Sequence, residues 1–219
     1  MVSSNAKERM LRRAAADILP GMTVNLGIGL PTEVLQYVPA NMPVCLHSEN
    51  GITGVGPVLS ADKADRNLID AGGAYVSVIP GTAFFDSAIS FAIVRSGRLD
   101  LTLLGAFEVA ANGDLANWKI PGKFSPGMGG AIELAQKARR VGVIMTHTDR
   151  KGDSKILEEC TLPLTAKGRV NRIYTDMAVL DVTPTGLELV EIAEGVSLAE
   201  LREATRAPLH VADQGVPNF

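Results

Sequence analysis

The stretch 22-MTVNLGIGLP-31 places a short apolar run directly before a glycine turn and a proline. Met22–Leu26 has the length and the side chains of a buried strand. Gly27-Ile28-Gly29 has the composition of a tight turn. Pro31 suits the first turn of a helix, where a backbone N–H is not needed. A strand that passes through a tight turn into a helix is the repeating unit of α/β folds.

The same alternation of strand and helix patterns continues along the chain. Helices are expected to begin near the capping-box pattern Asn5–Glu8, after Asp86, over 131–138 and after Ser197. Strands are expected at Val44–His47, Tyr75–Ile79, Leu99–Leu104 and Val141–Met145, with loops at 51–57 and 112–130. Ile173–Val182 and Leu187–Ile192 flank Thr183–Gly186 and predict a C-terminal hairpin. The fold class predicted is therefore α/β, a mostly parallel sheet flanked by helices with a C-terminal hairpin.

Length and charge limit the classes of function. The chain has 219 residues and no repeat or linker that would divide it, so residues 1–219 are expected to form a single domain. The net charge is −3, which argues against a nucleic-acid partner. No apolar run approaches the ~18 residues of a membrane span, and no secretory signal is visible before the charged residues 7–13. We expect a cytoplasmic protein with no membrane partner.

The cysteines and histidines argue against a metal centre. Cys45 and Cys160 lie far apart in apolar surroundings, which predicts buried free thiols in a reducing compartment. The three histidines are dispersed, and none has a metal-ligand spacing to a cysteine: His47, His147 and His210. The sequence predicts no metal site.

The tetrapeptide Ser48-Glu49-Asn50-Gly51 carries the strongest chemical signal. It places a carboxylate where a buried strand ends and a glycine turn begins, the usual ligand edge of a parallel sheet. Glu49 could act there as a base, a metal ligand or a nucleophile, or it could be a capping carboxylate on a loop. Glycines at 51, 54 and 56 leave room around it, which favours a functional role. His47, on the same strand face, could tune its ionisation or make a structural hydrogen bond.

Two glycine-rich segments are weaker candidates. The turn at Gly27 and Gly29 lacks the third glycine of a dinucleotide fingerprint, so it is either a backbone cradle or a plain turn. Gly127-Met128-Gly129-Gly130 precedes a helix and could present N–H groups to a developing oxyanion, or it could be a flexible loop. Trp118, in the loop before it, could line a pocket or cover the core.

Together these residues resemble a known family. The segments Asn25–Gly29, Ser48–Gly51, Ala116–Trp118 and Gly127–Ala131 resemble the β subunit of the class I 3-oxoacid CoA-transferases, in register from about Ala6 to the last helix. The resemblance implies the CoA-transferase fold and an α subunit as partner, expected as an α2β2 assembly. It implies no cofactor, because coenzyme A is a substrate.

The resemblance also implies roles for individual residues. Glu49 matches the nucleophile that attacks an acyl-CoA and then carries CoA as a glutamyl thioester in ping-pong chemistry. Gly129 or Gly130 matches a glycine that supplies an N–H donor to the tetrahedral intermediates. The remaining substrate-binding positions are those of the wall beside the glutamate and of its own turn: Asn25, Gly27, Gly29, Asn50 and Gly51.

One departure and several alternatives remain open. Gly73 stands where some relatives carry a lysine, so a contact to CoA phosphate would have to come from elsewhere, such as Lys119 or Lys123. Arg172–Asp176 resembles the 3-oxoadipate branch, whereas Trp118–Gly122 resembles the branch acting on acetate and on acetoacetate, the acid of ketone-body metabolism. A non-catalytic α/β binding domain is the alternative from another class.

Overall fold

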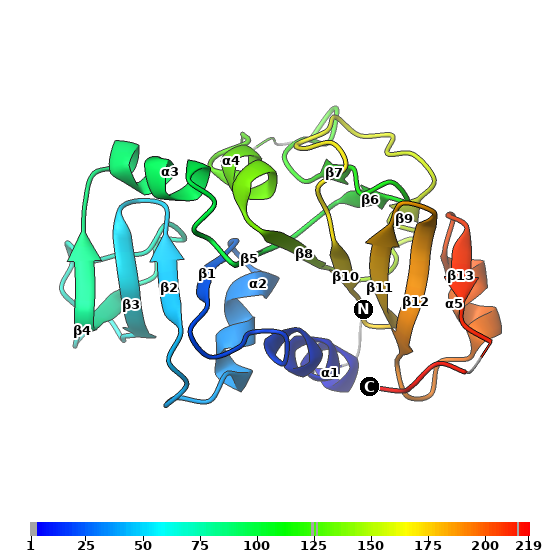
Figure 1. Cartoon of the computed structure of the whole chain (residues 1–219), viewed down its shortest axis with the longest axis horizontal. Coiled ribbons are helices and arrows are strands. Elements are labelled where there is room, and N and C mark those ends of the chain that lie inside the picture. Colours follow the sequence, from blue (N-terminus) through cyan, green and yellow to red (C-terminus); the bar gives the residue numbers. More distant parts are fainter. Residues whose placement is uncertain (1–3, 124, 126, 214) are drawn as a thin grey trace.

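The computed structural model describes residues 4–123, 125, 127–213 and 215–219. A ten-stranded sheet runs through the whole molecule (Figure 1), with strands in the order β13-β12-β11-β10-β8-β5-β1-β2-β3-β4. Its central strands are β1 (Thr23–Leu26), β2 (Cys45–Ser48), β5 (Leu101–Leu104), β8 (Arg140–Ile144) and β10 (Arg172–Tyr174). Every pairing among these five is parallel. The mostly parallel α/β sheet predicted from the sequence is confirmed.

Antiparallel strands extend the sheet on both sides. One wing holds β3 (Ile52–Val58) and β4 (Val76–Phe84), and the other holds β11 (Ala178–Thr183), β12 (Gly186–Ile192) and β13 (Leu209–Val211). β11 and β12 form the predicted hairpin, and β13 pairs with β12 in parallel. The predicted strand Ile173–Val182 was wrong in one respect, because it is two strands joined by a turn. The Thr175 hydroxyl accepts hydrogen bonds from the backbone N–H groups of Met177 and Ala178, and this local bonding turns the chain back.

Two more predictions about loops were wrong. Gly54 and Gly56 lie within β3, at irregularities of its pairing with β4, where a glycine tolerates the local bend. The expected loop over 112–130 contains β7 (Leu115–Ala116), which pairs with β6 (Glu108–Ala110) and, through it, with β9 (Ile156–Leu157) in a separate small sheet. Residues 124 and 126 of that stretch lie outside the described residues.

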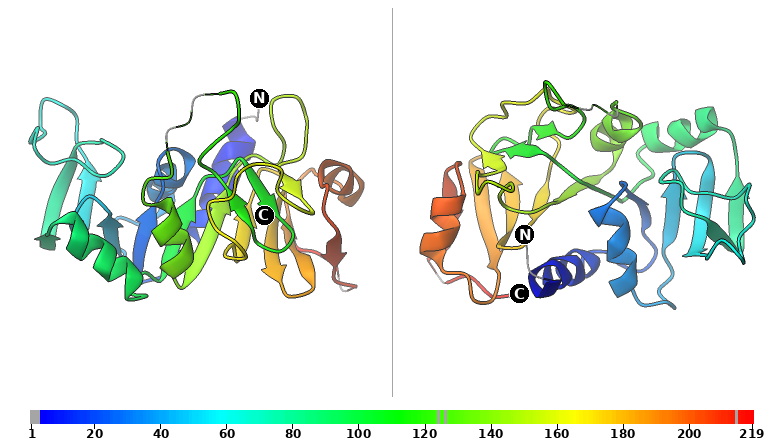
Figure 2. Two further views of the ribbon diagram at one scale, coloured as in Figure 1. Left: turned by 90° about the horizontal axis from the view of Figure 1, so that it is seen from above. Right: turned by 180° about the vertical axis from the view of Figure 1, so that it is seen from behind.

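Helices cover both faces of the large sheet, as predicted. α1 (Ser4–Ala15), α2 (Leu30–Glu33) and the 3₁₀ turn η1 (Val34–Tyr37) lie on one face, and α3 (Ser87–Arg95) and α4 (Ala131–Lys137) lie on the other (Figure 1). α5 (Leu198–Ala204) packs at the far end beside β13 (Figure 2). Asn5 lies inside α1 and is therefore not its N-cap, whereas Ser197 caps α5 with the predicted capping box.

The alternation of side chains along β5 separates two apolar cores. Leu101 and Leu103 point to the α1 face with Met10, and Leu104 points to the α3–α4 face with Leu134. Thr102 also lies on the α3–α4 face, as does Asn25 one strand away, because residues in register across parallel strands share a face. This face carries the candidate site.

A charged cluster fastens α1 to the sheet. The Asp17 carboxylate, just after the helix, accepts hydrogen bonds from Arg13, Arg172 and Tyr174. Burial opposes its charge, but the hydrogen bonds from Tyr174 and Arg13 outweigh burial and hold the pKa of Asp17 below its usual value. No helix within the described ranges is long and apolar enough to cross a membrane.

Candidate active site

Glu49 lies in the tight turn that joins β2 to β3, at the carboxyl end of β2. Its side chain is half-buried. Gly51 closes the turn: its N–H donates to the Ser48 carbonyl, and its own carbonyl accepts from the Phe85 N–H at 2.9 Å. A Cβ at position 51 would overlap the Phe85 carbonyl oxygen, and φ is +120° there. The turn that carries Glu49 therefore requires glycine at this position.

Asn25, on the neighbouring strand β1, makes a hydrogen bond to Glu49. Its amide Nδ2 donates to Glu49 Oε2 and to the His47 carbonyl oxygen, both at 3.0 Å. Asn25 is 1% exposed, and its register partner on β2 is His47. The buried amide is therefore a positioned donor to the carboxylate, and the predicted proximity of Asn25 and Glu49 is confirmed.

His47 lies behind this pair. Its Nδ1 is 3.3 Å from Asn25 Nδ2, and its Nε2 is 3.0 Å from the Ser90 hydroxyl on α3. Burial lowers the pKa of His47 below its ordinary value, and the nearby charge of Glu49 opposes that shift. Ser90 is fully buried, and its place could not be predicted from the sequence, because the helix pattern does not indicate which face of the helix meets the sheet.

Gly130 brings the start of α4 close to the Glu49 side chain. A Cβ built at Gly130 would lie 3.3 Å from Glu49 Cγ and 3.2 Å from the ring of Phe91 on α3. Neither the Gly129 nor the Gly130 N–H donates a hydrogen bond to any group that the structure describes. Two segments some eighty residues apart in sequence thus meet at Glu49, as the resemblance implied, and the Gly130 backbone is close enough to act on a reacting group there.

The other predicted site residues are nearby in the fold but are bonded elsewhere. The Gly27 N–H donates to the Leu103 carbonyl at 2.8 Å, Gly29 is the N-cap of α2, and the Asn50 amide donates to the Ile69 carbonyl at 2.7 Å. Among the described residues, no hydrogen bond joins any of these three to Glu49. Their roles in substrate binding remain predictions.

The loop 69–74 is held against the turn that carries Glu49, a contact that the sequence did not indicate. Ser48 Oγ accepts from the Ala71 N–H at 2.8 Å, and Asp70 Oδ1 accepts from the N–H groups of Gly72 and Ala74. Gly73, the position where some relatives carry lysine, lies in the resulting tight turn. The loop therefore forms one wall beside Asn50 without offering a cation at position 73.

Trp118 covers the core rather than lining the candidate site. Its indole N–H donates to the Leu164 carbonyl at 3.3 Å, and the Lys119 ammonium lies over its ring. The neighbouring Asn117 bonds to Gly105 and Thr165. The polar groups of this segment therefore tie it to the loop at 164–165 and to Gly105, just after β5.

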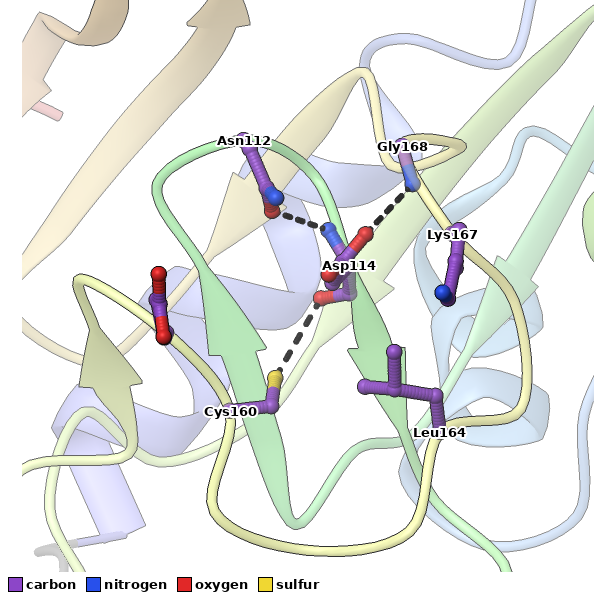
Figure 3. A pocket seen from close by; sticks show the side chains of 7 residues that line it. Asn112, Asp114, Cys160, Leu164, Lys167 and Gly168 are labelled. Atoms are coloured by element: carbon purple, nitrogen blue, oxygen red, sulfur yellow. Dashed lines mark hydrogen bonds between the residues drawn. The ribbon is translucent and has the colours of Figure 1, made fainter.

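A hollow of about 600 Å³ lies elsewhere, between the β6–β7 hairpin and residues 159–168 (Figure 3). Its polar groups bond one another: Asp114 accepts from the Gly168 N–H, its N–H donates to Asn112, and its carbonyl accepts from the Cys160 thiol. Burial raises the pKa of Cys160 to about 12, so the thiol is not a nucleophile at neutral pH. None of the predicted site residues lines this hollow.

The cysteine and histidine side chains are the remaining candidates for a metal site. Cys45 and Cys160 are free, as predicted, but both are half-buried rather than buried. His147 is fully buried between the hydroxyls of Thr175 and Thr205, and burial lowers its pKa to about 4. Within the described residues, no three His, Cys, Asp or Glu side chains are placed to hold a metal ion together.

A buried amide that holds a strand-end carboxylate against a glycine-rich helix start is an arrangement suited to acyl transfer. Residues 7–204 match the family model "Coenzyme A transferase", and the chain belongs to this family. The class predicted from the sequence, a CoA-transferase, is confirmed.

Named relatives share almost the whole chain. It is 48% identical over 205 residues to one subunit of the succinyl-CoA:3-ketoacid coenzyme A transferase of Helicobacter pylori strain J99, covering 94% of this chain and 99% of the relative. It is 47% identical over 210 residues to one subunit of the 3-oxoadipate CoA-transferase of Acinetobacter baylyi, covering 95% and 97%. It is 45% identical over 208 residues to the beta subunit of the acetate CoA-transferase of Escherichia coli strain K12, covering 95% of each chain.

A solved structure shows the same fold. The acyl-CoA transferase YdiF of Escherichia coli O157:H7 superposes with a TM-score of 0.78 at 22% identity. The match covers 97% of this chain but only 43% of the YdiF chain. This likeness supports the fold and shows that one CoA-transferase chain extends well beyond the part that resembles this protein.

Proposed function

We propose that this chain is the β subunit of a cytoplasmic 3-oxoacid CoA-transferase, which moves CoA from an acyl-CoA such as succinyl-CoA to a 3-oxo acid. The observation that carries the proposal is the setting of Glu49. Its carboxylate is held by the Asn25 amide at 3.0 Å, and its Cγ methylene lies beside Gly130. A carboxylate is a weak nucleophile, so its orientation before the reaction contributes much of the rate.

The proposed reaction is ping-pong, with Glu49 as the nucleophile. A Glu49 oxygen attacks the thioester carbonyl and forms a C–O bond, the C–S bond breaks, and CoA leaves as a thiolate, which gives an acyl–glutamyl anhydride. The thiolate then attacks the glutamyl carbonyl of that anhydride, a C–O bond breaks, and the first acid leaves as a carboxylate. Glu49 now carries CoA as a thioester, and a second acid reverses both steps. No proton is gained or lost, so the site needs an orienting donor and N–H groups for the oxyanions, not a general acid.

An α subunit is the partner that this proposal requires. Apolar side chains are exposed around the Glu49 turn: Ile28 on the turn after β1, Ile69 in the loop held by Asn50, Phe84 at the end of β4 and Ile89 on α3. β4 is also an edge strand of the large sheet (Figure 1), and a long apolar edge is normally covered. We propose that the α subunit covers this surface in an α2β2 assembly.

Three acids are candidates for the acceptor of CoA. The named relatives act on 3-ketoacids, on 3-oxoadipate and on acetate, at nearly equal identity to this chain. Acetoacetate is proposed first, with 3-oxoadipate and acetate as alternatives. A panel of these acids, assayed with succinyl-CoA on one preparation of the complex, distinguishes them by relative kcat/KM.

Trapping the thioester tests the function. The chain, co-purified with its α-type partner, is incubated with acyl-CoA and no acceptor acid, and the Glu49 peptide is examined by mass spectrometry. The expected result is CoA on Glu49, and irreversible inactivation when borohydride reduces the thioester.

Variants complete the test. Glu49→Gln should form no adduct, and Glu49→Asp should be severely impaired because its carboxylate is one methylene short. Glu188→Gln, on an exposed side chain of β12, is the matched control and should behave as the wild type. Transferase activity retained in Glu49→Gln, or an adduct mapped to another acid, would refute the role of Glu49. A complex that binds acyl-CoA but never exchanges it would favour the non-catalytic alternative.

A further inference from the structure

The groups that hold Glu49 form a row that starts inside the protein. Ser90 on α3, His47 on β2 and Asn25 on β1 are 0%, 4% and 1% exposed. Ser90 Oγ lies 3.0 Å from His47 Nε2, His47 Nδ1 lies 3.3 Å from Asn25 Nδ2, and Asn25 Nδ2 lies 3.0 Å from Glu49 Oε2. Each member therefore contacts the next, and only the last reaches the partly exposed carboxylate.

The chemistry of these groups fixes the tautomer of the ring. An amide nitrogen with two hydrogens can only donate, so His47 Nδ1 must accept from Asn25. A neutral imidazole that accepts at Nδ1 carries its proton on Nε2, and it therefore donates to the Ser90 hydroxyl. A second ring proton would set an N–H against the Asn25 N–H.

The orientation of the amide is equally constrained. A flip of the Asn25 side-chain amide would exchange Nδ2 and Oδ1. Oδ1 would then face both the Glu49 carboxylate and the His47 carbonyl oxygen, which are also acceptors. As it stands, Nδ2 has three acceptors for its two hydrogens, all supplied by β2 or its turn. The His47 Nδ1 contact is the longest of these, so it shares a hydrogen with the other two.

Nothing holds the amide from its other side. Asn25 Oδ1 is buried without a hydrogen-bond partner among the described residues, and so is the hydroxyl of its register neighbour Thr102 on β5. A buried polar atom without a partner is unusual and is a source of rotational freedom. The orientation of the Asn25 amide therefore depends on its contacts with β2 and the following turn. Of these contacts, the one to the His47 side chain can be removed by a substitution that leaves Glu49 unchanged.

We propose that His47 is a positioning residue of the transferase: as a neutral ring with its Nε2–H directed at Ser90, it accepts from the Asn25 amide at Nδ1 and fixes that amide in the orientation that holds Glu49. The proposal rests on the proposed function, because it concerns how the nucleophile is held. Among the described residues, the His47 ring makes hydrogen bonds to Asn25 and Ser90 and none to Glu49, so it acts through Asn25.

Three variants test the role in the co-purified complex. His47→Leu removes the acceptor and should lower kcat and the rate of Glu49 adduct formation by roughly 10–100-fold, with little change in KM, because misplacing a reacting group costs rates of that order. His47→Asn keeps a side-chain oxygen in the place of Nδ1 and should recover activity to within about tenfold of the wild type. His210→Leu, which removes an exposed imidazole on β13, is the matched control and should leave both rates unchanged.

The tautomer is measured independently of activity. In the complex labelled with ¹⁵N-histidine, the His47 signals, identified by their loss in His47→Leu, should show a protonated Nε2 and an unprotonated Nδ1. Ser90→Ala should move this population toward the other tautomer and lower the adduct rate less than His47→Leu does.

The outcomes separate the two proposals. If His47→Leu melts earlier but retains wild-type kcat and adduct rate, or if Nδ1 carries the proton, then His47 is only structural and this inference is wrong while Glu49 stands. If the wild-type complex forms no Glu49 adduct at all, the proposed function fails, whatever the tautomer of His47.

Discussion

Gly130→Ala isolates the close approach between α4 and Glu49. The backbone at Gly130 has φ −75° and ψ −9°, a conformation that alanine adopts without strain. The new Cβ would nevertheless meet Phe91 Cζ at 3.2 Å and Glu49 Cγ at 3.3 Å. Ordinary carbon contacts are about 3.5–4.0 Å, so one of the two side chains must move by a few tenths of an ångström.

The expected effect on stability is small. Losing a glycine stabilises by about 0.4–1 kcal/mol through the unfolded chain, and overpacking destabilises by about 1–3 kcal/mol. The half-buried Glu49 and Phe91 can both yield, so the overpacking is expected at the low end and the net change at about 1 kcal/mol or less.

The expected effect on catalysis is large. Displacing a reacting group by part of an ångström, while a methyl group crowds the N–H donors beside it, should lower kcat by roughly 10–100-fold, or about 1.4–2.7 kcal/mol of barrier. Single-turnover formation of the glutamyl-CoA adduct should slow by the same factor, since the defect lies in the chemical step.

Two companion variants make the test specific. Gly105→Ala adds a methyl group in open space, with nothing within 4 Å of the new Cβ, and should alter neither property. Gly130→Ala combined with Phe91→Leu should recover part of the lost rate, because the ring no longer forces the Cβ against Glu49. If Gly130→Ala keeps the wild-type adduct rate, or if it only lowers the melting temperature, Gly130 is a turn residue and the reasoning is wrong.

Three further predictions concern stability, reactivity and assembly. Asp17→Asn should lower the free energy of unfolding by about 3 kcal/mol and Tm by roughly 6–12 °C. This is the low end for breaking a buried ion pair, because Arg13 and Arg172 each keep a second carboxylate as partner. Because the folded-state pKa of Asp17 is depressed, its contribution to stability is present at pH values above the ordinary carboxyl pKa. The difference in stability between variant and wild type should therefore shrink as pH falls below about 4. A constant difference down to pH 2 would contradict this. Cys160, with its pKa raised to about 12, should react with iodoacetamide at pH 8 more slowly than in the unfolded chain by a factor on the order of a hundred or more, and equal rates would show that burial does not control the thiol. Phe84→Glu should weaken binding of the α subunit without unfolding the chain, since its side chain is 61% exposed, and unchanged affinity in sedimentation or light-scattering measurements would place the interface elsewhere.

The centre of the fold could be predicted because its signals are local. The apolar runs of β1, β2, β5 and β8 and the caps at Asp86 and Ser197 depend on residues within a few positions of one another. The wings could not be predicted in the same way. β3 contains glycines at 54 and 56 that are typical of a loop, and it becomes a strand only because β2 and β4 supply its backbone partners.

The candidate site shows the same division between local and distant information. Glu49 and the need for Gly51 were visible in the sequence, because a carboxylate before a glycine turn at the end of a strand is a local pattern. Ser90 and Phe91 were not, because their place depends on which face of α3 meets β2. The choice of His47 as a structural or a tuning residue also stayed open in the sequence, since it depends on the tautomer that Ser90 and Asn25 impose.

The order of strands in the sheet explains why Asn25 can hold Glu49 at all. β1 and β2 are parallel neighbours, so Asn25 and His47 lie side by side, and Glu49, in the turn directly after β2, lies beyond the end of β1. A side chain on β1 that points to the same face can therefore reach forward to a carboxylate beyond the strand end, while its own backbone stays within the sheet. The fixed donor at 3.0 Å is thus a consequence of the parallel centre of the fold, whereas the Glu49 carboxylate itself sits on the turn that begins the antiparallel β3–β4 wing.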